Sequence, residues 1–463
     1  MDSHHCAGDS YRLMVIRRNG SEILLLPNGS GWALPLVEIH PQQRVAEQLA
    51  SEVSRGWGLE VYCLFVPRHR TSGGNGVANY SVMESVRNND KAPAGTYWMP
   101  PTVATGCGGV SEAGVVRESL EELGSFARGE TPGPFARPGW LRELFEWAQE
   151  QVGPLGLRLT GGFRQLNASP TFSLMRLETN EGALWFKATG EPNAHELPVS
   201  LFLARVFPRH VPRILGVHPA WNGWLMEEVP GSELDQTAEC AAWERAAEQL
   251  AELQIASIGR GAELLEAGCK DLQTRSLVVR IDPFLARMAE FMAAQKKPSP
   301  APLSASELAS LSGKLEEACK LLLSFGLPDT LGHIDFNSGN ILVSRDRCVF
   351  LDWAEGCVAN PLITLEYLRQ HLKRSALQET LAVERVTDAY LRPWTSFHSP
   401  DDLRRALALS PLVAVFVYAV ANYSWRSLDA IHNPKLAGYF RSLTRRMYRE
   451  AIQAAERSEL CLD

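Results

Sequence analysis

The alternation of apolar and polar positions divides the chain into a β-rich first part and a helical second part. Residues 11–67 alternate short apolar runs with turn residues, which is typical of strands, and one helical stretch, residues 43–55, interrupts them. Apolar runs between residues 80 and 101 predict two more strands. Residues 127–139 are rich in proline and glycine, which indicates a boundary before a helix that we predict over residues 140–151.

A second unit begins after that helix. Residues 157–190 contain apolar runs that predict three strands, and a helix follows with Glu196 in its first turn. From Asp235 onwards apolar positions recur with a helical period, which predicts an almost wholly helical region. One apolar run, residues 406–423, approaches the length of a membrane span, but its proline, its asparagine and its charged flanks favour a buried helix.

One stretch of the second unit, residues 331–355, breaks the helical pattern. Its apolar runs predict a short strand, a polar loop, a strand over residues 340–344, a turn and a last strand over residues 348–351. Polar groups at strand ends can be held rigidly, as a functional site requires. We therefore expect the chemistry of the protein in this stretch.

Four polar residues of this stretch suit phosphoryl transfer. Transfer from ATP needs a carboxylate that orients and deprotonates the attacking hydroxyl, together with magnesium ions and a lysine on the phosphates. Asp335 is the expected catalytic base, and His333, two residues earlier, is expected to support the loop rather than to titrate. Asn340 and Asp352 offer the hard oxygen ligands that Mg²⁺ prefers.

The sequence HIDFNSGNIL followed by LDW resembles the H-G-D-x-x-x-x-N-(I/L)-L … (I/L)-D-W pattern of the aminoglycoside phosphotransferase and choline kinase-like family. The resemblance covers residues 157–455, with Ile334 where the family usually has glycine. It implies a small-molecule kinase with a protein-kinase-like, two-lobed α+β fold. It also implies that Lys187 contacts the α- and β-phosphates of ATP, with either Glu196 or Glu191 as its partner.

The resemblance further implies where the nucleotide binds. The connection between the lobes contains Glu227 and Glu228, where the backbone would recognise adenine. The phosphate-covering loop, residues 165–171, lacks the G-x-G-x-x-G of protein kinases, and Asn167 and Ser169 would either donate to phosphate or serve as ordinary turn residues. The absence of D-F-G and A-P-E motifs argues against a protein kinase.

The β-β-α-β-β order of the first 125 or so residues resembles a Nudix fold, and so implies an N-terminal α/β domain. Of the glutamates in the metal-binding signature of that family, only Glu52 has a counterpart here, and one carboxylate does not hold a divalent cation. We therefore expect this domain to be inactive. A second stretch, RESLEELG, has Glu118, Glu121 and Glu122 but follows the strands; it predicts an exposed amphipathic helix, with metal-dependent hydrolysis as the alternative.

Length and composition indicate a multidomain protein of 463 residues. We divide the chain into a Nudix-like domain (1–126), a linker and helix (127–156), a small lobe (157–230) and a large lobe (231–463). The net charge of −7 gives no reason to expect a nucleic-acid partner, and the start of the chain has no secretory signal. Nine scattered cysteines favour a reducing cytoplasm, so we expect a cytoplasmic protein without a membrane partner; nothing in the sequence defines an oligomeric state.

Together these features predict an ATP- and Mg²⁺-dependent phosphotransferase that acts on a hydroxyl of a small molecule. Glu355, three residues after Asp352, would either face a cationic acceptor such as an amino sugar or choline, or lie in solvent as a helix cap. The missing glycine loop favours an alternative function: a catalytically silent pseudokinase that binds a nucleotide or another ligand as a sensor or scaffold.

Overall fold

The computed structural model describes residues 9–40, 44–67, 79–88, 91–105, 112–375, 377 and 379–456. The chain forms two compact units. The first contains the residues up to Leu197 together with Arg213–Glu228, and the second contains Pro198–Pro212 and the residues from Val229 onwards. Helix α5 (Glu196–Val206) begins in the first unit and continues in the second.

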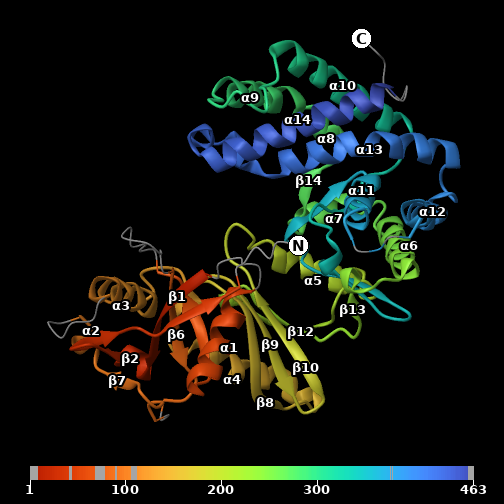
Figure 1. Ribbon diagram of the computed structural model, residues 1–463. Helices are drawn as coiled ribbons and strands as arrows, with labels where there is room; N and C mark the ends of the chain where they lie inside the picture. The colour runs from red at the N-terminus through yellow and green to blue at the C-terminus, as the bar shows by residue number, and fades with distance from the viewer. Residues whose placement is uncertain are drawn as a thin grey trace. The chain divides into compact units, whose positions relative to one another are not determined.

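The first unit contains two sheets (Figure 1). The sheet formed by the N-terminal residues has the order β3-β2-β1-β6-β5, with β4 paired to β1 and β7 paired to β2, and only β1 and β6 run parallel. The other sheet is antiparallel, with the order β11-β12-β10-β9-β8. The elements are β1 (Asp9–Arg17), β2 (Glu22–Asn28), β3 (Gly31–Ala33), β4 (Leu36–Ile39), α1 (Val45–Trp57), β5 (Val61–Phe65), β6 (Asn79–Ser85), β7 (Tyr97–Met99), α2 (Pro101–Thr105), α3 (Ala113–Ala127), α4 (Trp140–Val152), β8 (Leu159–Ala168), β9 (Ser173–Thr179), β10 (Gly182–Ala188), β11 (Ile214–His218) and β12 (Gly223–Glu227).

Strand β1 is buried on both faces, which explains its nearly continuous apolar sequence. Because side chains alternate along a strand, Leu13 and Val15 pack into one core, which includes Leu49 of α1. Met14 and Ile16 pack into another core on the opposite face. The N-terminal sheet is therefore covered on both sides.

The second of these cores joins the two sheets of the first unit. Phe135 and Trp140 lie in it with their ring centroids 5.1 Å apart, and it continues to Phe186 of β10. In addition, the buried Gln165 of β8 accepts a hydrogen bond from the backbone N–H of Cys63 (2.7 Å) and donates one to its carbonyl (3.0 Å). The stretch rich in proline and glycine thus contributes to a packed core, while the domain boundaries placed there stay a prediction.

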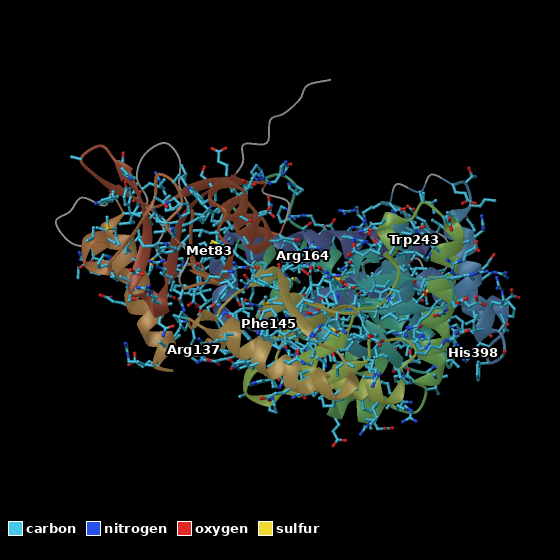
Figure 2. All side chains as sticks on the ribbon, turned by 90° about the horizontal axis from the view of Figure 1, so that it is seen from below. Met83, Arg137, Phe145, Arg164, Trp243 and His398 are labelled. Atoms are coloured by element: carbon cyan, nitrogen blue, oxygen red, sulfur yellow. The ribbon has the colours of Figure 1, made fainter. Side chains whose placement is uncertain are left out.

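The second unit is mainly helical, with two small sheets of order β13-β16-β17 and β14-β18-β15. Its elements are β13 (Ser232–Glu233), α6 (Cys240–Ala256), α7 (Gly261–Glu266), β14 (Lys270–Leu272), α8 (Thr274–Val278), α9 (Ile281–Ala293), α10 (Ala305–Ser324), β15 (Thr330–His333), β16 (Ile341–Val343), β17 (Cys348–Phe350), β18 (Gly356–Ala359), α11 (Pro361–Leu372), α12 (Ala382–Trp394), α13 (Pro400–Ala421) and α14 (Pro434–Glu456). The fully buried Trp243 of α6 belongs to the large core that these helices share (Figure 2).

Most of the predicted elements are confirmed. Helix α4 matches the helix predicted over residues 140–151, and β8, β9 and β10 are the three strands predicted within residues 157–190. The predicted helix over residues 43–55 is α1, two residues further on, although residue 43 lies outside the described part of the chain. Helix α13 is long and apolar enough to cross a membrane, but 72% of its most apolar window is buried, as expected for a core helix.

Candidate active site

The stretch that carries the candidate chemistry forms the strands that its pattern predicts. Strand β15 ends at His333, β16 and β17 follow the polar loop as an antiparallel pair, and β15 pairs with β18 so that His333 lies opposite Gly356. These short strands and the polar loop between them, residues 330–359, are called the catalytic segment below. The loop itself contains one 3₁₀ turn, Ser338–Asn340.

His333 is buried and connects the two ends of the catalytic segment. Its Nδ1 accepts a hydrogen bond from the backbone N–H of Asp335 (3.2 Å), so the proton is on Nε2, which donates to the carbonyl of Leu351 (3.2 Å). Burial lowers the pKa of His333, although the carboxylates of Asp352 and Asp335 act in the opposite direction. The neutral imidazole therefore holds the loop in place.

Asn340 fixes the same loop from its other end. Its Nδ2 donates to the backbone carbonyl of Asp335 (3.2 Å), which also accepts from the N–H of Asn337 (2.8 Å). The Oδ1 of Asn340 makes no hydrogen bond within the described part of the chain. This amide oxygen can coordinate a metal ion or accept a hydrogen bond from a ligand.

Asp352 has a left-handed backbone conformation, with φ 63° and ψ 57°. A residue with a Cβ rarely adopts positive φ because of steric crowding, although aspartate and asparagine tolerate it better than most. Such conformations persist where the surrounding structure requires them, and they are frequent at functional sites. Asp352 also lies close enough to His333 to influence its pKa, so the structure brings His333, Asp335, Asn340 and Asp352 together.

Lys187 and Glu196 form a buried ion pair in the first unit. The Nζ of Lys187 lies 2.5 Å from Oε1 of Glu196, with the side chains 10% and 2% exposed, and 5.9 Å from the ring centroid of Trp224. Of the two candidate partners for the lysine, the structure therefore pairs it with Glu196 rather than Glu191. The ammonium group of a lysine can donate three hydrogen bonds, and its positive charge suits anionic oxygens such as those of phosphates.

The remaining predicted nucleotide contacts make ordinary structural interactions. Ser169 closes the β8–β9 turn, since its Oγ accepts from the N–H of Phe172 (3.0 Å), while Asn167 pairs with Leu174 in the ladder. Ser169 is thus a turn residue, whereas Asn167 lies in strand β8; a role of either in binding phosphate stays a prediction. The Glu228 carboxylate accepts two hydrogen bonds from Arg176, at 2.6 and 3.1 Å, and the N–H of Glu227 donates to the carbonyl of Arg213 (3.0 Å).

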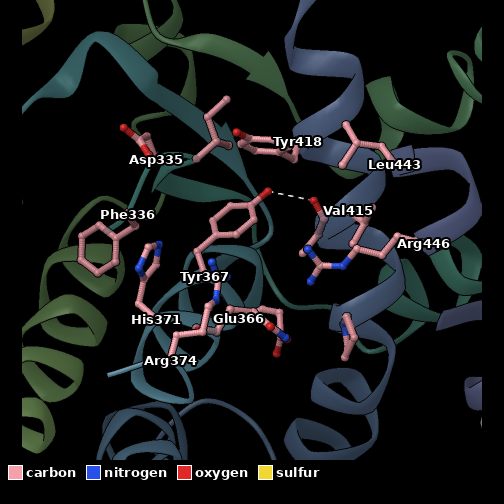
Figure 3. A pocket seen from close by; sticks show the side chains of 14 residues that line it. Asp335, Phe336, Glu366, Tyr367, His371, Arg374, Val415, Tyr418, Leu443 and Arg446 are labelled. Atoms are coloured by element: carbon pink, nitrogen blue, oxygen red, sulfur yellow. Dashed lines mark hydrogen bonds between the residues drawn. The ribbon is translucent and has the colours of Figure 1, made fainter. Parts of the chain in front are cut away.

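A cavity of about 300 Å³ within the second unit has Asp335 among its lining residues (Figure 3). Helix α11 forms one wall, and α13 and α14 form another. Its polar and aromatic lining residues other than Asp335 were not singled out from the sequence: Phe336, Glu366, Tyr367, Gln370, His371, Arg374, Tyr418 and Arg446. The available signal was the spacing of four residues between Glu366 and Gln370, which places two polar side chains on one face of a helix.

Glu355, for which the sequence left two alternatives, is not among the residues that line this cavity. Its carboxylate forms an ion pair with Lys270 of β14. The two residues are neighbours because β14 pairs with β18, whose first residue follows Glu355. The Glu355 carboxylate is thus compensated by an ion pair inside the protein.

The acidic residues of α1 are paired as well. Glu52 binds Arg55 on the same helix (2.7 Å), and Glu47 binds Arg164 of β8 (Figure 2). Helix α3 is amphipathic, with Val115, Leu123 and Phe126 buried, as predicted for the stretch that contains Glu118, Glu121 and Glu122. Within the described residues, no three His, Cys, Asp or Glu side chains are grouped so that they could hold a metal ion.

Comparison with protein families identifies the class of the central region. Residues 191–397 match the model of the phosphotransferase enzyme family, so the chain contains a phosphotransferase-family domain that includes the whole catalytic segment. The match covers less than half of the chain. No curated protein matches the sequence.

Three of the solved structures that match this chain have names that describe a kinase or a phosphotransferase. An ethanolamine kinase from Plasmodium vivax has 14% identity and a TM-score of 0.47, covering 74% of this chain and 95% of its own. A macrolide 2'-phosphotransferase from Brachybacterium faecium has 17% identity and a TM-score of 0.41, covering 63% and 98%. The GDP complex of aminoglycoside 2'-phosphotransferase-IIIa has 14% identity and a TM-score of 0.43, covering 67% and 98%. At these values the family match alone identifies the domain.

Proposed function

We propose that the protein is an ATP- and Mg²⁺-dependent phosphotransferase that acts on a hydroxyl group of a small molecule. One observation carries the proposal: Asp335 lines a cavity, while His333 and Asn340 fix its backbone, inside a phosphotransferase-family domain. Phosphoryl transfer depends mainly on positioning and charge stabilisation, so a rigid carboxylate beside a small cavity suits it.

Each of the grouped side chains has a role in this reaction. Asp335 orients the acceptor hydroxyl and takes its proton as the oxygen attacks the γ-phosphorus, and the bond to the bridging oxygen of ADP breaks. His333 is a positioning residue, because it is neutral and holds the backbone of Asp335. Lys187, held by Glu196, binds the phosphates of ATP.

The donor set of the catalytic segment fits Mg²⁺. The Oδ1 of Asn340 and the carboxylate of Asp352 are hard oxygen ligands, and Mg²⁺ is usually held by one or two carboxylates together with substrate phosphates. The ion would supply positive charge that stabilises the phosphoryl oxygens during transfer. The same proposal includes a protein-kinase-like, two-lobed fold for residues 157–455, an inactive Nudix-like domain in front of it, and a cytoplasmic location without nucleic-acid or membrane partners.

The test is replacement of the proposed base. The full-length protein is incubated with Mg²⁺ and either ATP or GTP and with a panel of hydroxylated acids, sugars, amino sugars and amino alcohols, and transfer is followed by release of the nucleoside diphosphate and by ³¹P NMR of the product. Asp335→Ala is expected to lower kcat by about a thousandfold, because both orientation and proton transfer are lost. The matched control is Asp346→Ala in the exposed turn between β16 and β17, which is expected to behave like the wild type.

A wild-type rate of phosphate transfer in Asp335→Ala would show that Asp335 is not the catalytic base. A wild-type protein that binds nucleotide but transfers phosphate to no acceptor would instead support the silent pseudokinase.

A further inference from the structure

The charged side chains around the cavity beside Asp335 discriminate between classes of acceptor (Figure 3). Two carboxylates, Asp335 and Glu366, and two guanidinium groups, Arg374 and Arg446, line it. His371 also lines it, and burial and the charge of Arg374 lower its pKa, although Asp335 and Asp235 act in the opposite direction. The imidazole is therefore neutral at neutral pH. The net charge of the cavity then depends on which of the two carboxylates and two guanidinium groups already have partners of opposite charge.

The negative charge of Glu366 is compensated inside the protein. Its side chain is only 3% exposed, one carboxylate oxygen accepts from Arg369 (2.8 Å), and the other accepts from the amide of Gln370 (2.6 Å). A buried carboxylate with a charged partner and a second donor has its hydrogen-bonding capacity largely used. Glu366 therefore does not provide a site for a cationic ligand.

The two arginines are compensated much less. Arg446 is 38% exposed and its nearest carboxylate, that of Glu450, lies 3.8 Å away, beyond hydrogen-bond distance. The Nε of Arg374 donates to the backbone carbonyl of Gln370 (3.0 Å), and within the described part of the chain its guanidinium makes no ion pair. The part of the cavity formed by Arg374 and Arg446 therefore has excess positive charge, although the chain as a whole has a net charge of −7.

The aromatic residues of the cavity do not reverse this preference. Tyr367 and Tyr418 have ring centroids 6.3 Å apart, an arrangement that could in principle bind an ammonium group. However, the positive charge of Arg446 belongs to the same cavity: burial raises the pKa of the Tyr367 phenol, and Arg446 acts in the opposite direction. The Tyr367 hydroxyl is also occupied, since it donates to the carbonyl of Ala414 (2.8 Å). A cationic acceptor would be repelled here.

The size of the cavity limits the acceptor further. A volume of about 300 Å³ lies at the lower end of the range for sites that bind small molecules. This favours a ligand of one ring or one short chain over an oligosaccharide.

We propose that the acceptor is a small hydroxylated anion, with its hydroxyl at Asp335 and a carboxylate or phosphate ester bound by Arg446 and Arg374. This inference rests on the proposed phosphotransferase function and specifies its substrate class. Guanidinium groups bind carboxylates and phosphates with two parallel hydrogen bonds, so both anions suit the site. In the reaction the acceptor oxygen forms a bond to the γ-phosphorus, the hydroxyl proton goes to Asp335, and ADP leaves with the electron pair of the broken P–O bond.

The experiment compares acceptors that share a carbon skeleton and differ in charge. The full-length protein with Mg²⁺ and ATP is assayed with glycerate and gluconate against glycerol and sorbitol, with glycerol 3-phosphate against glycerol, and with choline and glucosamine as cations. We expect kcat/KM to be about tenfold to a hundredfold higher for the anionic member of a pair. The carboxylate and phosphate arms distinguish the two kinds of anion.

Variants then locate the preference at the arginines. Arg446→Met and Arg374→Gln are expected to raise KM for anionic acceptors about tenfold to a hundredfold and to leave kcat within about threefold, because they remove binding that is equal in the ground and transition states. Arg446→Lys should recover part of the loss. The matched control is Arg449→Met, an exposed residue of α14 that does not line the cavity.

The possible results separate the inference from the proposed function. Preference for neutral or cationic acceptors, unchanged in Arg446→Met, overturns the anionic acceptor and leaves the phosphotransferase intact. No transfer by the wild type to any acceptor overturns both. If Arg446→Met does not fold, the acceptor pairs measured with the wild type still decide, and binding of the same compounds to Asp335→Ala, followed as a shift in Tm, gives a readout independent of turnover.

Discussion

The catalytic segment and helix α1 both carry acidic residues in stretches that resemble active-site motifs, and the structure treats them differently. In the catalytic segment, Asp335 lines a cavity and makes no ion pair within the described part of the chain. On α1, Glu52 and Glu47 are each bound to an arginine. Carboxylates that already have cationic partners stabilise structure, whereas a carboxylate facing a cavity is available for a proton or a ligand.

The backbone conformation also differs between the catalytic segment and helix α1. Asp352 of the catalytic segment lies at positive φ, which the structure maintains at some cost in free energy. The described residues of α1 form a regular helix that ends at Gly58, where a glycine accommodates positive φ without strain. Positive φ at an acidic residue, a cavity and a buried histidine thus occur together in the catalytic segment, whereas the described residues of α1 form a regular helix.

The largest effect that would sharpen this contrast is expected from Asp352→Asn. Asparagine tolerates positive φ about as well as aspartate, so the backbone should be retained while one anionic Mg²⁺ ligand is lost. We expect kcat to fall by about a thousandfold, equivalent to about 4 kcal/mol, because charge stabilisation by the ion is weakened. The measurement is the phosphate-transfer rate as a function of Mg²⁺ concentration, with Tm as the check on folding. An unchanged rate and an unchanged Mg²⁺ requirement would remove Asp352 from the metal site.

The catalytic segment could be predicted because its signal is local. Strands of three or four residues, a polar loop and a following aspartate all lie within 25 consecutive residues, so spacing alone brings His333, Asp335 and Asn340 together. The partner of Lys187 was left open between two glutamates, because the sequence pattern does not define how the turn residues before α5 fold. Glu191 lies in that turn, and the lysine pairs with Glu196, the first residue of α5.

The cavity and the role of Glu355 could not be predicted in the same way, because both depend on distant segments. Lys270 lies 85 positions before Glu355 and meets it through the parallel pairing of β14 with β18. Arg446 reaches the cavity from α14, more than 100 positions after Asp335 in the sequence. Sequence patterns within one element do not encode such contacts, so the two arginines that line the cavity, Arg374 and Arg446, were not expected there.

A smaller effect, on the pH dependence of stability, is expected from a substitution of His210. This residue contacts the catalytic segment. Its carbonyl accepts from the N–H of Phe350 (2.8 Å), and its ring is stacked on that of Phe350 at 6.1 Å. Burial lowers the pKa of His210 to about 4, and the charges of Arg209 and Arg347 contribute. Because this pKa lies below that of the unfolded chain, the unfolded state binds a proton first, and stability falls as the pH drops through 6.5 towards 4.

His210→Phe tests this dependence. Phenylalanine retains the stacking and cannot take up a proton. We expect the difference in unfolding free energy between variant and wild type to shift by about 2 kcal/mol in favour of the variant between pH 7.5 and pH 5. The measurement is urea unfolding of both proteins at the two pH values. Parallel pH profiles for the two proteins would show that His210 is not the group responsible.

The smallest effect is expected from Glu52→Gln on α1. A large effect of this substitution would contradict the difference described between the catalytic segment and α1. The Glu52 and Arg55 side chains are 30% and 71% exposed, and exposed ion pairs at this helical spacing contribute less than about 0.5 kcal/mol. We therefore expect no measurable change in unfolding free energy or in phosphate transfer. Hydrolysis of nucleoside diphosphate derivatives should be absent with Mg²⁺ or Mn²⁺, measured in the Asp335→Ala background so that phosphate transfer does not interfere. Metal-dependent hydrolysis that disappears in Glu52→Gln would mean that α1 holds a cation after all, and that pairing with arginine does not distinguish the two motifs.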